Sequence, residues 1–246
     1  MEDSIRDELC DLMMELSRRL WSLQKPLLVK REAGTSLSRL LAPRLKVPGN
    51  GDQRRISEQE ARIVLCQMLD QKNSSFSYYS VETPTNGKFQ FKGKRGLRAR
   101  TDMTLYSEDE KRLVDIEFKE GNPPVPSIDK DIWKLLKEGR NGVWFHILKN
   151  TDHQTFSFLF KKIRESFCEH AKDAGANSRT LAFAICVLAP ENPSLRVTYE
   201  SLIELGDTEA NWMEKVARLF AENEAMPRRQ DGWRVWQEAQ SQENRS

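Results

Sequence analysis

The sequence lacks any apolar run long enough to cross a membrane, since no stretch approaches the roughly 18–20 consecutive apolar residues that a spanning helix needs. Its N-terminus, Met1-Glu2-Asp3-Ser4, is acidic and has no apolar segment of the kind found in secretory signal peptides. These two absences predict a cytoplasmic protein with no membrane partner.

Cysteine and histidine are scarce. The four cysteines are widely spaced in apolar patterns, which indicates reduced thiols in a core and argues against a disulfide framework or a zinc site: Cys10, Cys66, Cys168 and Cys186. The three histidines, His146, His153 and His170, also show no metal-ligand spacing. His146 lies in an apolar strand pattern, so we expect a core residue there.

The net charge of +2 is too small to indicate nucleic acid by itself, but its distribution is uneven. Between positions 88 and 100 the sequence has six basic residues and no acidic one: Lys88, Lys92, Lys94, Arg95, Arg98 and Arg100. Aromatic residues and glycines interleave with them. A solvated loop is one interpretation. The position of the run directly before Asp102 favours contact with a phosphate backbone.

Two segments after this run, residues 100–106 and 114–119, alternate apolar with polar residues as half-buried strands do. The polar stretch between them predicts a hairpin turn. If the turn is centred between Asp109 and Glu110, Asp102 faces Glu117, with their Cβ atoms about 4.5–5.5 Å apart. Two like charges so placed are unfavourable unless a cation lies between them.

Lys119 projects from the same sheet face as Glu117, whereas Val114, Ile116 and Phe118 point to the other face, where a helix would bury them. Paired carboxylates suit Mg²⁺ or Mn²⁺. Such an ion polarises a phosphoryl oxygen and lowers the pKa of a bound water, which a nearby lysine can orient. A surface hairpin with ordinary charges is the alternative.

Asp102 and the string Glu117-Phe118-Lys119 resemble the motif of the PD-(D/E)xK nuclease superfamily, which has the restriction-endonuclease-like fold. Thr101 stands where that motif has proline. The resemblance covers roughly residues 55–190. It implies that Asp102, Glu117 and Phe118 hold Mg²⁺, for which Mn²⁺ can substitute, and that Lys119 lies at the attacking water.

The resemblance also implies the substrate and the biological setting. The expected activity is hydrolysis of phosphodiester bonds in DNA, with RNA not excluded, and analogy suggests a role in bacterial defence or restriction. The alternative from another class is a non-cleaving nucleic-acid-binding or assembly subunit that retains the fold. The presence of all three motif residues counts against that alternative.

Two predicted helices flank the motif. Ser57 and Glu60 form a capping box at the start of a helix that ends near Asn73. Members of the superfamily often carry a glutamate near the metal on this helix; both Glu58 and Glu60 are candidates, with Glu60 preferred as a catalytic residue unless it only caps. On a helix from Ser127 to Gly139, Lys130 is the closest match to a basic residue near the active site. The predicted nucleic-acid contacts are therefore Lys92, Lys94, Arg95, Arg98, Arg100 and Lys130.

Apolar runs at 142–148 and 180–188 predict central strands, and an amphipathic pattern over 156–174 predicts a helix between them. We therefore expect an α/β fold, a three-layer sandwich with a central mixed β-sheet flanked by helices, restriction-endonuclease-like and extended by an N-terminal helix. The expected divisions are an N-terminal helix and basic connector (1–50), a nuclease-like core (51–222) and a C-terminal tail (223–246). A further helix is expected around Trp212 to Phe220.

The N-terminal helix, residues 4–24, carries an apolar stripe at spacings of four and three: Leu9, Met13, Leu16, Leu20 and Leu23. This stripe can pair two subunits or cover the chain's own core. We favour the subunit seam, because a Gly- and Pro-containing basic connector separates the helix from the core. The sequence thus predicts a homodimer or larger assembly, with a protein partner as a further possibility.

Overall fold

The computed structural model describes residues 3–24, 44–47, 51–54, 56–71, 74–89, 97–138, 141–149, 153–171, 181–188, 195–198 and 233–236. The helices are α1 (Asp3–Gln24), α2 (Glu58–Gln71), α3 (Val125–Glu138) and α4 (His153–Ala171). The strands are β1 (Arg44–Val47), β2 (Gly51–Arg54), β3 (Tyr78–Phe89), β4 (Leu97–Tyr106), β5 (Arg112–Glu120), β6 (Asn141–Leu148), β7 (Leu181–Val187), β8 (Leu195–Thr198) and β9 (Trp233–Trp236).

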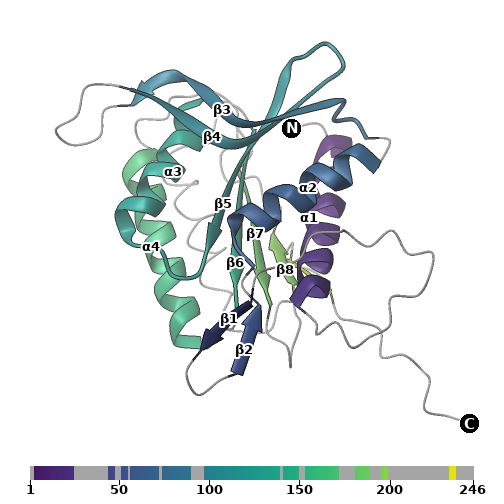
Figure 1. The fold of residues 1–246 in the computed structure, drawn as a ribbon. Coiled ribbons are helices and arrows are strands. Elements are labelled where there is room, and N and C mark those ends of the chain that lie inside the picture. Colours follow the sequence, from purple (N-terminus) through teal and green to yellow (C-terminus); the bar gives the residue numbers. More distant parts are fainter. Residues whose placement is uncertain are drawn as a thin grey trace, which may run out of the picture.

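The strands from β3 to β9 form one mixed sheet in sequence order, and β1 and β2 form a separate hairpin. Within the sheet β5, β6 and β7 run parallel, while β3, β4 and β5 are joined antiparallel. Helices α1 and α2 cover one face of the sheet, and α3 and α4 cover the other (Figure 1). This arrangement confirms the predicted α/β architecture with helices on both faces of a mixed sheet.

From Met103 to Leu105 the β4–β5 hairpin has the register that the sequence predicts; the register shifts at Tyr106, and the expected pair of Asp102 with Glu117 lies beyond the end of the ladder. Met103 faces Ile116, and Leu105 faces Val114. Val114, Ile116 and Phe118 are buried in the core beneath α1 and α2, as the alternation of apolar and polar residues requires. Glu117 and Lys119 alternate with these apolar residues along β5, so they point to the opposite face of the sheet, toward α3.

Strand β3 is an element that the sequence analysis missed. It forms an edge of the sheet, pairs with β4, and shifts register between Pro84 and Lys88. The described ends of the expected basic loop, residues 88–89 and 97–100, belong to these two strands, and Lys88 faces Arg98. Of the predicted nucleic-acid contacts, Lys92, Lys94 and Arg95 lie outside the described residues.

Helix α1 packs onto the chain's own core, which corrects the expectation that its stripe forms a subunit seam. Leu9, Met13, Leu16 and Leu20 are fully buried in the same cluster as residues of α2 and of the sheet, and Leu23 packs against that cluster. Side chains so enclosed present no surface to a partner. Helix α1 thus shares the core of the segment that follows it.

Other predictions concern the ends of the chain and the cysteines. The helix expected around Trp212 to Phe220 lies outside the described residues. Strand β9 extends the sheet by pairing with β8. Cys10, Cys66 and Cys186 are not in disulfides, and the first and last of them are buried. Among the described helices, none combines the length and apolar character that a membrane span requires.

His146 is a core residue, as its strand pattern indicates. The imidazole is fully buried on β6, with Nε2 2.7 Å from the carbonyl oxygen of Gly121 and Nδ1 3.2 Å from the indole nitrogen of Trp144. Because the indole N–H can only donate, Nδ1 accepts and Nε2–H donates to Gly121. Burial lowers the pKa of His146 to about 4. The neutral ring thereby anchors the turn that follows β5.

The packing of α1 predicts the cost of truncating its stripe. Leu16→Ala should lower the free energy of unfolding by about 2–5 kcal/mol, because it leaves a cavity in a fully buried cluster. Asp7→Ala on the exposed face of the same helix is the matched control. Chemical denaturation measures both effects, and light scattering should give one molecular mass for all three proteins. If Leu16→Ala instead has the stability of the wild type and a lower molecular mass, the stripe forms a subunit seam.

The lowered pKa of His146 predicts a loss of stability on acidification. The unfolded state binds this proton below about pH 6.5 and the folded state only near pH 4, so stability falls between those values. The loss should reach about 3 kcal/mol, at about 1.4 kcal/mol per pKa unit. His146→Gln, which retains a donor and an acceptor, should remove this contribution. Denaturant melts of both proteins from pH 7.5 to 4 give the difference; parallel curves would contradict it.

Candidate functional site

Asp102 lies where β4 and β5 separate. The paired residues end at Met103 and Ile116, and beyond them the Phe118 N–H donates to Oδ2 of Asp102 at 2.8 Å. In an unbroken ladder of this register, that N–H would bond to the carbonyl of Thr101. The Asp102 carboxylate thus takes the place of a backbone acceptor and ties the two strands together.

Glu117 is buried beside a buried lysine. Its side chain is 1% exposed, and its Oε1 lies 2.7 Å from the ammonium group of Lys134 on α3. Burial raises the pKa of Glu117 well above its usual value; the negative charges of Asp131 and Asp102 add to this, and Lys134 opposes it. Asp102 is thus close enough to Glu117 for its negative charge to contribute to this raised pKa.

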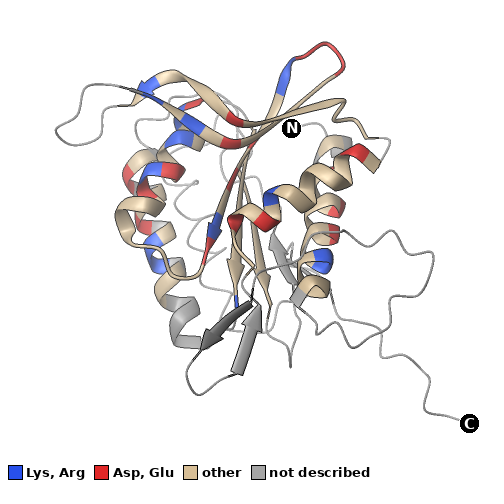
Figure 2. Cartoon of the chain, viewed as in Figure 1, with Lys and Arg blue, Asp and Glu red and all other residues tan. Residues whose placement is uncertain are grey.

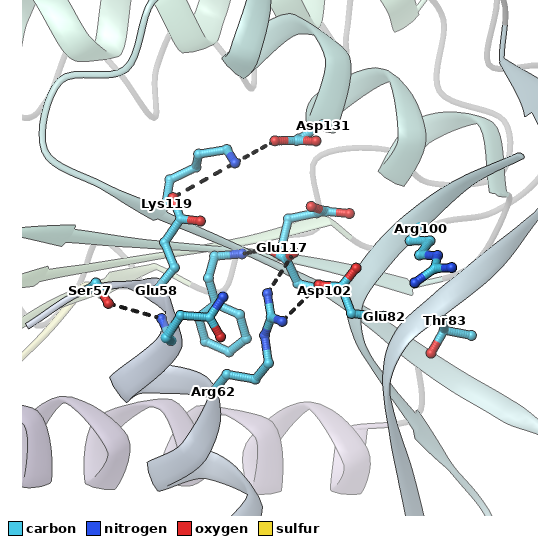
Figure 3. A network of polar contacts seen from close by, with 12 residues as sticks. Ser57, Glu58, Arg62, Glu82, Thr83, Arg100, Asp102, Glu117, Lys119 and Asp131 are labelled. Atoms are coloured by element: carbon cyan, nitrogen blue, oxygen red, sulfur yellow. Dashed lines mark hydrogen bonds and ion pairs between the residues drawn. The ribbon is translucent and has the colours of Figure 1, made fainter. Parts of the chain in front are cut away.

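Lys119 points from the same face of β5 toward α3, where its ammonium group lies 2.6 Å from Oδ2 of Asp131 (Figure 3). Burial by itself lowers the pKa of Lys119, but the Asp131 carboxylate outweighs this and raises it above its usual value. Lys119 is therefore a cation at neutral pH. It can donate hydrogen bonds but has no lone pair with which to accept a proton.

Arg62 connects α2 to the hairpin. Its guanidinium lies 3.0 Å from Oδ1 of Asp102 and 2.8 Å from Oε1 of Glu82 on β3. Glu82 adopts a φ of 52°, a conformation that non-glycine residues rarely adopt. Both oxygens of Asp102 are thus engaged, one by Arg62 and one by the backbone of Phe118.

The two candidate glutamates at the start of α2 have different surroundings. Glu60 accepts the Ser57 N–H at 2.7 Å and contacts the Ser57 hydroxyl, so the predicted capping box is confirmed. Glu58 instead accepts the Glu120 N–H at 3.2 Å and lies 3.9 Å from Lys119 (Figure 3). Burial raises the pKa of Glu58. The structure therefore brings Glu58, rather than the preferred Glu60, to the motif residues.

A similar difference separates the lysines of α3. Lys130, the residue selected from the sequence, is exposed, whereas Lys134 lies among Glu117, Asp131 and the carbonyl oxygen of Arg100. Its ammonium group is 2.8 Å from that carbonyl oxygen. Lys130 and Lys134 are four residues apart and so share one face of the helix, and only the packing of α3 against β4 and β5 distinguishes them.

The basic residues of the β3–β4 hairpin lie next to the motif. Arg98 and Arg100 are exposed, and they share one face of β4 with Asp102 because side chains alternate along a strand. Glu138, at the end of α3, accepts the backbone N–H groups of Asn86 and Gly87 at 3.0 and 3.1 Å. The hairpin is therefore fastened to α3. Figure 2 shows Lys and Arg on the part of the hairpin near α3, and Asp and Glu at the β4–β5 turn.

The oxygen atoms at the strand separation suit a hard divalent cation. Asp102 and Glu117 offer carboxylates, and the Phe118 carbonyl faces β4, since the N–H and C=O of one strand residue point to the same side. Two carboxylates and a carbonyl match the ligand preference of Mg²⁺ and Mn²⁺. Each carboxylate already attracts a cationic side chain, Lys134 or Arg62. The oxygen donors fit the ion that the motif implies, and that ion would compete with Arg62 and Lys134 for the two carboxylates.

A second acidic group lies elsewhere among the described residues. Ligand atoms of Asp129, Glu169 and His170 all lie within 4.8 Å of one another between α3 and α4. Asp129 accepts the Ser166 hydroxyl at 3.0 Å and lies 2.7 Å from Nε2 of His170. These contacts account for the group as part of the packing of α4 against α3.

No protein-family model, curated protein or solved structure matches the chain.

Proposed function

We propose that this protein is a metal-dependent nuclease of the PD-(D/E)xK type, with a restriction-endonuclease-like core, that hydrolyses phosphodiester bonds in DNA. One observation carries the proposal: Asp102, Glu117 and Lys119 converge where β4 and β5 separate, with Asp102 bonded to the backbone of Phe118. This placement brings two acidic side chains and a cation to one point of a sheet.

In this proposal Asp102, Glu117 and the Phe118 carbonyl hold the cation. Bound Mg²⁺ would polarise a phosphoryl oxygen and lower the pKa of a coordinated water. Lys119 donates a hydrogen bond to a phosphoryl oxygen, stabilising the charge that develops as the P–O bond to water forms and the P–O bond to the leaving oxygen breaks. The attacking water releases a proton to solvent, and the leaving oxygen takes a proton from solvent. Because Asp131 keeps Lys119 protonated, the lysine acts as a donor and not as a base.

Glu58 is the supporting acidic residue in this proposal. Its carboxylate lies 3.9 Å from the Lys119 ammonium group, and the charge of Asp102 contributes to its raised pKa. It can accept a hydrogen bond from a water at the site. The carboxylate of Glu60, in contrast, is directed to the N-terminus of α2.

The hairpin supplies the surface for the nucleic-acid backbone. Arg98 and Arg100 precede Asp102 by four and two residues on one strand, so they share its face of the sheet. Guanidinium groups bind phosphate through paired hydrogen bonds. A strand of DNA that follows these arginines would bring a phosphate to the carboxylates, and single-stranded RNA has the same backbone charge.

Removing either carboxylate should abolish metal-dependent cleavage. Asp102→Asn and Glu117→Gln preserve shape but remove a metal ligand worth several kcal/mol of transition-state stabilisation, which is a loss on the order of 10³-fold or more in rate. Plasmid, linear and single-stranded DNA and single-stranded RNA, incubated with Mg²⁺, Mn²⁺ or EDTA, test the activity. Glu58→Gln should lower the rate more than Glu60→Gln, whose effect falls on the stability of α2.

Circular dichroism and a thermal melt of each variant provide the control for folding. Binding of DNA by the wild type without cleavage of any substrate would favour the alternative, a non-cleaving subunit. Wild-type rates in Asp102→Asn or Glu117→Gln would remove these residues from the reaction.

Neutralising the hairpin arginines should weaken binding of DNA and reduce its dependence on salt. For Arg98→Ser with Arg100→Ser, each lost phosphate contact should reduce the slope of log K against log salt by about 0.9 on duplex DNA. Lys111→Ser, an exposed lysine at the β4–β5 turn, is the control and should leave the slope unchanged. Fluorescence anisotropy from 50 to 300 mM salt measures both. Equal slopes in all three proteins would show that the arginines are only solvated.

A further inference from the structure

Four charged side chains form a buried chain of alternating sign between β5 and α3. Glu117 pairs with Lys134 at 2.7 Å, Lys134 with Oδ1 of Asp131 at 2.7 Å, and Asp131 Oδ2 with Lys119 at 2.6 Å. The side chains of Asp131 and Lys134 are 5% and 4% exposed. Asp131 therefore pairs with two ammonium groups, that of Lys134 through Oδ1 and that of Lys119 through Oδ2.

The spacing on the two elements explains this chain. Glu117 and Lys119 are two residues apart on a strand and share a face, and Asp131 and Lys134 are three apart on a helix and share a face. Helix α3 is fixed against the sheet by Ile128, Ile132, Leu135 and Leu136, all of them buried. The carboxylate of Asp131 is thus presented from a rigid element.

Holding a lysine in place carries an entropic cost. A lysine side chain has roughly 2 kcal/mol of rotamer entropy, and without a partner its ammonium group samples several positions. Of the acidic contacts that Lys119 makes, the Glu58 pair at 3.9 Å is far longer than the Asp131 pair. Asp131 is consequently the group that determines where the Lys119 ammonium lies.

We propose that Asp131 is a positioning residue of the site: it fixes Lys119 for donation to the phosphoryl group. This inference rests on the proposed nuclease function and extends it to Asp131 on α3. In this role Asp131 acts on the reaction through Lys119, and not as a ligand of the substrate or of the cation.

A double-mutant cycle tests whether Asp131 acts through Lys119. Single-turnover cleavage and KM are measured at saturating Mg²⁺ for the wild type, Asp131→Asn, Lys119→Met and the double variant. Asp131→Asn should slow cleavage on the order of 10–100-fold with KM for DNA unchanged, as expected when a residue that orients a ligand is removed. In the Lys119→Met background the same change should cost less than about 2-fold, because its target is gone.

Asp129→Asn on the same helix, with its contacts to Ser166 and His170, is the matched control and should cleave at the wild-type rate. Asp131→Glu retains the charge and displaces the carboxylate by one methylene group. If Asp131→Asn fails to fold, Asp131→Glu should replace it in the cycle, with a loss of roughly 3–10-fold that again disappears beside Lys119→Met.

The outcomes separate the two proposals. Equal fold-losses from the Asp131 change in both backgrounds, or a wild-type rate in Asp131→Asn, would overturn the positioning role while leaving the nuclease function intact. A wild type that cleaves none of the substrates would overturn the proposed function, and the positioning role with it.

Discussion

The hydrogen bond from the Phe118 N–H to the Asp102 carboxylate is the interaction on which the site depends. It occupies the point where the backbone ladder between β4 and β5 ends. A buried N–H without an acceptor costs about 1–3 kcal/mol, so the side chain is needed once the strands diverge. The same bond holds Asp102 beside Glu117 and leaves its second oxygen for Arg62. This one hydrogen bond therefore underlies three features of the site: the separation of the strands, the proximity of the carboxylates and the approach of α2.

Charge balance imposes a second constraint on the site. Glu117 and Asp131 are both buried carboxylates, and each contacts the Lys134 ammonium group. Removing one member of such a network leaves an uncompensated charge in a region of low polarity, which is costly. Alternation of sign along the network reduces the repulsion that like charges would otherwise produce. The lysines of this site thus serve the folding of α3 onto the sheet as well as any chemistry.

The hairpin could be predicted from sequence because two local signals agreed. The polar turn fixed a register, and the apolar alternation of Val114, Ile116 and Phe118 fixed the faces. Strand β3 was missed because Pro84 and Gly87 are residues that usually interrupt strands. Proline is tolerated on an edge strand such as β3, because an edge strand has a neighbour on one side only. The signal that was available is the run Tyr78 to Val81, rich in residues that favour strands.

The spacing of residues in the sequence indicates which face of a helix packs on the sheet. It does not indicate how deeply each charged side chain on that helix is buried. Glu58 and Glu60 both occupy the first turn of α2, and the capping geometry assigns Glu60 to Ser57, which leaves Glu58 for β5. The cap was visible in the sequence and already argued against the assignment of Glu60 to the site, since one carboxylate cannot serve both positions.

The lysines of α3 and the stripe of α1 illustrate the same limit at the tertiary level. Lys130 and Lys134 are one turn apart, yet only Lys134 lies under the hairpin, because α3 crosses β5 near the Arg100 carbonyl. The stripe of α1 has the spacing of both a subunit seam and a core-facing helix. The deciding feature is the apolar face of β5 to β7, which α2 does not cover alone. An uncovered sheet face of that kind requires a second helix, and α1 is the helix that the structure places there.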